Sequence, residues 1–143
     1  MKFTQINEGV KHNDLKSLVT TKVTVADFEP KVGTVDDVTV VAFYVTDEKP
    51  ADDLARFIER GVIEILDTEV SPVADEDGMY LVFVEIKNED LMQKVLLMLE
   101  DVTRLVDITN WDIDFYNGQT INISSDDIST WIKTDKEWFK CSQ

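Results

Sequence analysis

Val-Asp-Asp-Val-Thr-Val-Val-Ala-Phe-Tyr-Val-Thr, residues 35–46, is the segment on which the predicted architecture depends. Its part from Val38 to Val45 is almost wholly apolar and rich in β-branched and aromatic residues, which favour strands. Both alternating faces are apolar, with Val38, Val40, Ala42 and Tyr44 on one and Val41, Phe43 and Val45 on the other. A strand with one face in water alternates apolar with polar residues, so this pattern predicts a central strand covered on both sides.

A second strand is predicted before this stretch. Residues 19–26 are rich in β-branched side chains and alternate with a period of two, as strands do. Pro30 and Gly33 then mark a loop. Because neighbouring strands joined by such a loop often pair, we expect an N-terminal hairpin.

Two helices and a hairpin are predicted after the central strand. Pro50 suits the first turn of a helix that ends at Gly61. Residues 62–70 and 79–87 are predicted strands, and the turn-forming residues between them indicate a hairpin. Asn88 is predicted to cap the second helix, whose apolar stripe runs from Leu91 to Leu105.

A last hairpin and a short helix are predicted near the C-terminus. Residues 111–116 alternate apolar with polar side chains, and Asn117-Gly118 is a strong hairpin signal before a return strand at 119–124. Residues 125–132 are predicted to form a short helix that carries Trp131.

The element order points to one fold class. From Val38 to Tyr116 the order is strand, helix, strand, strand, helix, strand, which is the ferredoxin-like βαββαβ pattern. It predicts an α+β fold with a mainly antiparallel sheet and both helices on one face, extended by an N-terminal strand and by a C-terminal hairpin plus short helix. We expect a single domain at 1–143, with its core at 35–124 and any flexible parts at 1–17 and 133–143.

The sheet face away from the helices would be unusually apolar. We expect it to carry Val41 and Phe43 beside Leu81 and Phe83, or the alternating partners of these residues. Exposed apolar patches of this size are usually covered. Either the N-terminal hairpin or the C-terminal helix covers this face within the chain, or a second copy or a protein partner does.

The charge balance excludes some partners. The chain has 14 Lys plus Arg against 29 Asp plus Glu, a net charge of −15, which repels nucleic-acid phosphates and anionic membranes. We therefore expect no direct nucleic-acid binding and no membrane binding. A single cysteine, Cys141, forms no internal disulfide, and the chain shows neither a signal-peptide core nor a membrane span. These features predict a soluble cytoplasmic protein.

Catalytic and cofactor-binding patterns are missing from the sequence. His12 and Cys141 are the only histidine and cysteine and lie near opposite ends, so neither a Cys–His pair nor a zinc site is expected. The five glycines are scattered and form no phosphate-binding loop. We therefore expect neither an enzyme nor a cofactor.

Two groups of carboxylates are candidate cation sites. Residues 75–78, Asp-Glu-Asp-Gly, share only part of the calcium-loop pattern, so a solvated hairpin tip is the preferred interpretation. Asp112 and Asp114 share a strand face, with Asp126 and Asp127 close in sequence. A cation or a carboxylate pair with raised pKa is the alternative there to the polar face of an edge strand, which we prefer. No metal site is predicted.

The middle of the chain resembles a viral family. The blocks are Glu-Lys-Pro-Ala-Asp-Asp-Leu-Ala-Arg-Phe-Ile-Glu-Arg-Gly at 48–61, Leu-Asp-Thr-Glu-Val-Ser-Pro at 66–72 and Asp-Gly-Met-Tyr-Leu-Val-Phe-Val-Glu at 77–85. They resemble small, poorly characterised proteins of T4-like tailed phages, especially marine ones. The resemblance brings no catalytic motif. It implies a structural or accessory protein made in a bacterial cytoplasm, or carried in the virion.

These features together predict a non-enzymatic interaction or assembly module. It would act through a sheet edge, its second sheet face or its C-terminal tail, where Trp138 and Phe139 are a candidate docking segment unless the tail folds onto its own domain. Two alternatives stay open. One is a ligand-sensing regulatory domain of ferredoxin-like type, supported by fold analogy alone. The other is an acidic mimic of nucleic acid that binds a basic protein.

Overall fold

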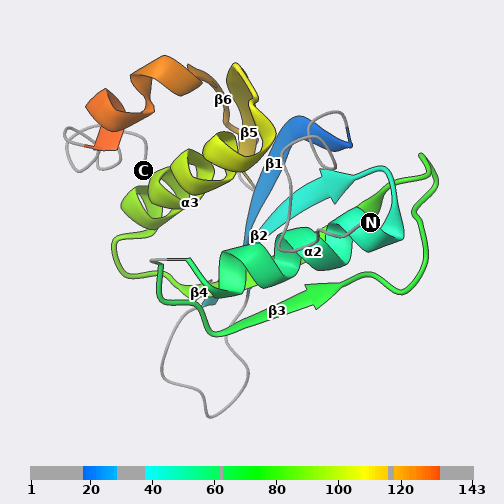
Figure 1. The fold of residues 1–143 in the computed structure, drawn as a ribbon. Helices are drawn as coiled ribbons and strands as arrows, with labels where there is room; N and C mark the ends of the chain where they lie inside the picture. Colours follow the sequence, from blue (N-terminus) through cyan, green and yellow to red (C-terminus); the bar gives the residue numbers. More distant parts are fainter. Residues whose placement is uncertain (1–17, 29–37, 62, 116–117, 133–143) are drawn as a thin grey trace, which may run out of the picture.

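The described residues form one mixed, six-stranded sheet with helices packed on it. Figure 1 shows the arrangement of these elements in the computed structural model. The structure describes residues 18–28, 38–61, 63–115 and 118–132. Its elements are β1 (Val19–Phe28), β2 (Val38–Val45), α2 (Glu48–Glu59), β3 (Asp67–Val70), β4 (Tyr80–Lys87), α3 (Leu91–Val106), β5 (Asn110–Phe115), β6 (Thr120–Ser124) and the 3-10 helix η1 (Ser125–Asp127). The predicted α+β class is confirmed.

The apolar segment Val38–Val45 forms a central strand, as predicted. The strand order is β3-β4-β2-β1-β5-β6, so β2 has a neighbour on each side. Val41 and Phe43, which point toward the helices, are 0% exposed, and on the other face Val40 and Ala42 are 5% and 6% exposed beside the half-buried side chains of Tyr44 and Phe83. The absence of polar residues between Val40 and Val45 reflects this burial.

The position of β1 differs from the prediction. β1 pairs antiparallel with β2, as a hairpin would, but it also pairs parallel with β5, with Val23 beside Ile113. The N-terminal strand is therefore a central member of the sheet, and it is neither a cover for the second face nor a flanking extension. In this position the backbone of β1 forms hydrogen bonds with both neighbouring strands, which it could not do if it lay across a face of the sheet.

Both long helices connect parallel strands that are not neighbours. β2 and β3 run parallel with β4 between them, and β4 and β5 run parallel with β2 and β1 between them. Each of α2 and α3 therefore completes a split βαβ unit. The first unit has one intervening strand, whereas the second has two because β1 lies between β2 and β5.

Helices α2 and α3 cover the same face of the sheet (Figure 1). One core cluster joins the buried side of α2, including Leu54 and Ile58, to α3 and to Val41 and Phe43 of β2. In that cluster the ring of Phe43 meets the ring of Trp111 edge-on, with centroids 5.9 Å apart. This face therefore holds the main core of the molecule.

Pro50 lies in the first turn of α2, as predicted, whereas the predicted start of α3 needs a correction. Asp47, at the N-cap of α2, accepts a hydrogen bond from the backbone N–H of Glu48. The predicted cap of α3 by Asn88 is wrong, since the N-cap is Asp90 in a left-handed conformation. Asn88 instead accepts a hydrogen bond from the hydroxyl of Thr39, the buried polar residue of β2. The amide thus satisfies a buried hydroxyl, which is costly to leave without a partner.

Two further elements refine the predicted boundaries. The strand predicted at 62–70 begins only at Asp67, because the chain from α2 must first return to the sheet edge, where Leu66 donates to the carbonyl of Glu85 at 2.7 Å. The second hairpin, β5–β6, is confirmed, and Gly118 adopts a φ of 91° at its turn. After η1, residues 128–132 form a helical turn whose Ile128 is part of the core cluster.

Candidate functional site

The sheet face opposite α2 and α3, named the second face below, is the candidate site. Directly opposed residues of neighbouring strands point to the same side of a sheet, so the register identifies its members. Ala42 is paired with Phe83 of β4 and with Thr24 of β1, while Tyr44 is paired with Leu81. The apolar centre of the second face consists of Val40, Ala42, Tyr44, Leu81 and Phe83.

The predicted surface of Val41, Phe43, Leu81 and Phe83 is corrected by this register. Val41 is paired with Val84 and Phe43 with Val82, so both point toward the helices and are fully buried. Leu81 and Phe83 lie on the second face and are half-buried. A shift of one residue in register moves a side chain to the opposite face of the sheet. The predicted surface therefore combined two residues of the helix side, Val41 and Phe43, with two residues of the second face, Leu81 and Phe83.

The apolar centre surrounds a depression of about 370 Å³. It is lined by side chains from four adjacent strands, namely Thr24, Val40, Ala42, Tyr44, Glu69, Leu81, Phe83 and Glu85. Glu69 of β3 is directly opposite Phe83, and Glu85 is directly opposite Val40. The depression is thus apolar at its floor and carries two carboxylates on the side of β3 and β4.

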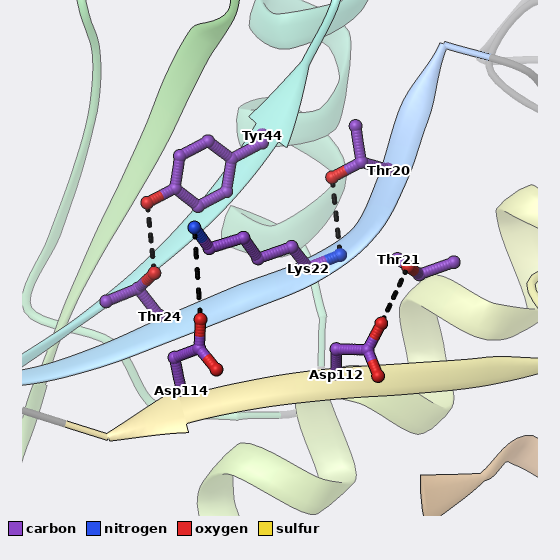
Figure 2. Close-up of polar contacts among 7 residues, drawn as sticks. All are labelled: Thr20, Thr21, Lys22, Thr24, Tyr44, Asp112 and Asp114. Carbon is purple, nitrogen blue, oxygen red and sulfur yellow. Dashed lines mark hydrogen bonds and ion pairs between the residues drawn. The ribbon is translucent and has the colours of Figure 1, made fainter. Parts of the chain in front are cut away.

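The margin toward β1 and β5 is polar, as Figure 2 shows. The ammonium of Lys22 lies 3.8 Å from a carboxylate oxygen of Asp114 and 5.1 Å from the centre of the Tyr44 ring. The hydroxyls of Tyr44 and Thr24 are hydrogen-bonded at 2.9 Å. Tyr44 therefore marks the border between the apolar and the polar halves of the second face, and both its ring and its hydroxyl contact side chains of β1.

Asp112 and Asp114 take separate partners. Asp112 accepts hydrogen bonds from the hydroxyl of Thr21 at 3.2 Å and from the amide of Asn122 at 2.5 Å, whereas Asp114 pairs with Lys22. Asp126 donates its backbone N–H to Ser124 at the start of η1. Within the described residues, no group of three or more His, Cys, Asp or Glu is placed to hold a metal ion.

The acidic hairpin tip has a structural explanation. One carboxylate oxygen of Asp75 accepts hydrogen bonds from the backbone N–H groups of Asp77 and Met79, both at 2.9 Å. Gly78 follows with a φ of 81°, a conformation that favours glycine. Asp75 thus stabilises the β3–β4 turn, in agreement with the preferred interpretation of this loop.

The remaining predicted residues lie elsewhere. His12, Trp138, Phe139 and Cys141 fall outside the described residues. The C-terminal helix proposed as a cover packs through Ile128 into the core cluster, which is on the helix side of the sheet. Neither β1 nor the described part of this helix covers the second face, so both intrachain covers are corrected for the described part of the chain.

A sequence signal for the correct face exists on β4. Glu85 and Lys87 have the same parity as Leu81 and Phe83, whereas Val82, Val84 and Ile86 are uninterrupted by charge. Charged residues mark the wetter face of a strand, and Val82, Val84 and Ile86 are indeed 0% exposed. On β2 no such marker exists, which is why Val41 and Phe43 were placed on the wrong side.

Comparisons with known proteins add no assignment. No family model matches the chain, and neither the search of curated proteins nor that of solved structures found a match. No helix of the described residues is long and apolar enough to cross a membrane.

Proposed function

We propose that this chain is a non-enzymatic protein-interaction module that binds a partner through the apolar centre of its second face. The observation that carries the proposal is the depression bounded by Tyr44, Leu81 and Phe83, which no element of the described residues covers. Large apolar side chains that gather at one surface depression commonly mark a binding site.

The fold and the resemblance are consistent with such a module. We interpret the series from β2 to β5 as a ferredoxin-like core with β1 inserted between its first and last strands, which widens the face available to a partner. The resemblance to T4-like phage proteins makes the proposed partner another phage protein or a protein of the infected bacterium.

Site-specific photo-cross-linking tests this function. A photoreactive phenylalanine analogue at position 83 should give a cross-linked product of higher mass in cells that naturally make the protein, because Phe83 borders the depression. The matched control is position 73, where Val73 is 70% exposed at the β3–β4 loop. If position 83 gives no product, or the same products as position 73, the proposed function is wrong.

A small-molecule site is a second candidate, favoured by the size of the depression. A volume of about 370 Å³ with an apolar lining and a few polar groups falls within the usual range for ligand pockets. A ligand that binds the folded state raises its melting temperature by mass action. A metabolite screen by thermal shift should then identify a compound whose effect disappears in the Phe83→Ser variant, and a screen without such a compound would dismiss this candidate.

A further inference from the structure

We propose that the partner presents a basic, amphipathic polypeptide segment, with an apolar side chain that enters the depression and Lys or Arg side chains beside it. This inference rests on the proposed function and adds the chemistry of the partner. Carboxylates surround the apolar centre, and only some of them have partners within the described residues.

Carboxylates flank the apolar centre on both sides. Asp67, Glu69 and Glu85 lie on the second face at β3 and β4, while Asp112 and Asp114 lie on it at β5. Among the residues that the structure describes, Lys22 and Lys87 are the basic residues that share this face by register. The surface around the depression is therefore net negative, like the chain as a whole at −15.

Only some of these carboxylates are engaged. Asp114 pairs with Lys22, and Asp112 accepts hydrogen bonds from Thr21 and Asn122. Within the described residues, neither Glu69 nor Glu85 has an ion-pair or side-chain hydrogen-bond partner. These two glutamates are also the carboxylates that line the depression. A cation brought in beside an apolar group would meet them first.

The apolar depression and the two glutamates beside it have different roles in binding. Burial of an aromatic or aliphatic side chain in the depression supplies affinity, as anchor residues do at protein interfaces. Exposed ion pairs add little affinity, but complementary charge speeds association and rejects acidic competitors. Glu69 and Glu85 would therefore select a basic segment from among apolar ones.

Other occupants fit the charges less well. A second copy of the chain would bring a further net charge of −15 against the same acidic rim. Nucleic acid would bring phosphates there, and both are repelled. A basic polypeptide segment is the occupant whose charge and apolar content complement this surface.

Selection from a displayed library of random peptides tests the inference on the full-length protein. Peptides recovered on the wild type should combine Lys or Arg with a Trp, Phe or Leu. Phe83→Ser should weaken the binding of a synthesised, selected peptide by roughly tenfold or more. Glu69→Gln with Glu85→Gln should weaken it by roughly three- to tenfold at low salt and less at high salt. Glu48→Gln with Glu76→Gln is the control, because it changes net charge equally away from the second face.

The outcomes distinguish a failure of this inference from a failure of the proposed function. One contrary result is a set of selected peptides that need Phe83 for binding and yet are neutral or acidic, and another is peptides that bind equally well after the Glu69 and Glu85 substitutions. Either result would overturn the inference of a basic partner, while the proposed interface on the second face would stand. If no peptide is enriched, or Phe83→Ser binds equally well, both proposals fail. The glutamate pair keeps the test valid should Phe83→Ser not fold.

Two results would name another occupant. A wild-type dimer in light scattering that dissociates with Phe83→Ser would assign the depression to a second copy. Peptide binding that begins only after residues 133–143 are deleted would assign it to the chain's own C-terminal segment. Either result overturns the inference of a separate basic partner.

Discussion

At the scale of single residues, Trp111 connects the two layers of the molecule. Its side chain is 0% exposed, its indole N–H donates to the hydroxyl of Thr103 on α3 at 2.8 Å, and its ring contacts Phe43 on β2. A buried donor that loses its acceptor costs free energy, so the hydrogen bond fixes how α3 sits on the sheet.

Thr103→Val should therefore lower the free energy of unfolding by about 1–3 kcal/mol, because it keeps the side-chain shape but leaves the indole N–H without its acceptor. Urea denaturation measures the change. Thr120→Val on the exposed surface of β6 is the control and should stay within about 0.5 kcal/mol of the wild type. Equal midpoints for both variants would show that the Trp111–Thr103 bond adds no stability.

Some features of single residues are predictable from the sequence, and others depend on contacts between distant parts of the chain. Trp111 was predictable as a core residue, because it alternates with acidic neighbours on a strand. The side on which Val41 and Phe43 point was not, because all residues around them are apolar and only the register with β4 decides it. The pairing of Lys22 with Asp114 depends on a contact between residues far apart in sequence, and no local pattern indicates it.

At the scale of elements, β1 is the strand whose role differs most from expectation. It lies between β2 and β5 rather than at the margin of the sheet. A strand with a neighbour on each side has its backbone amides bonded within the sheet, and such amides exchange only when the structure opens.

Hydrogen exchange should accordingly place the amides of Val23 and Val25 among the slowest in the protein, together with that of Val41. The amides of the edge strand β6 should exchange faster, because β6 has a single neighbour. Exchange resolved by residue, using NMR, makes the comparison. If β1 exchanges as fast as β6, β1 does not occupy the centre of the sheet.

Local chemistry explains which elements were predictable. The β3–β4 and β5–β6 hairpins depend on turn residues that are adjacent in sequence, including Gly78 and Gly118 with positive φ, and both were found from the sequence. The parallel pairing of β1 with β5 joins residues about ninety positions apart. No turn signal specifies such a contact, so the sequence indicated the strand but not its place.

At the scale of the whole molecule, net charge opposes the compact state. With 29 Asp plus Glu against 14 Lys plus Arg, like charges are brought closer together on folding. The ion pairs of the described residues, such as Arg56 with Asp53, lie at the surface and offset little of this repulsion.

Salt should therefore raise the melting temperature, by roughly a few degrees between low ionic strength and about 0.15 M, because screening shortens the reach of the repulsion. Thermal unfolding followed by circular dichroism measures this effect. NaCl and KCl should act alike, since screening depends on ionic strength. A melting temperature that falls with salt would mean that attractive charge pairs outweigh the repulsion.

The proposed interface requires that the second face is open to a partner, while the face that carries α2 and α3 is the closed core. Thiol labelling at adjacent positions of β4 tests it, in a Cys141→Ser background that leaves no other cysteine. Phe83→Cys should react with a maleimide in the folded protein within roughly tenfold of its rate in urea, whereas Val82→Cys should react only as fast as the protein opens. Equally slow labelling at both positions would mean that the second face is covered within the chain, and it would contradict the proposed interface.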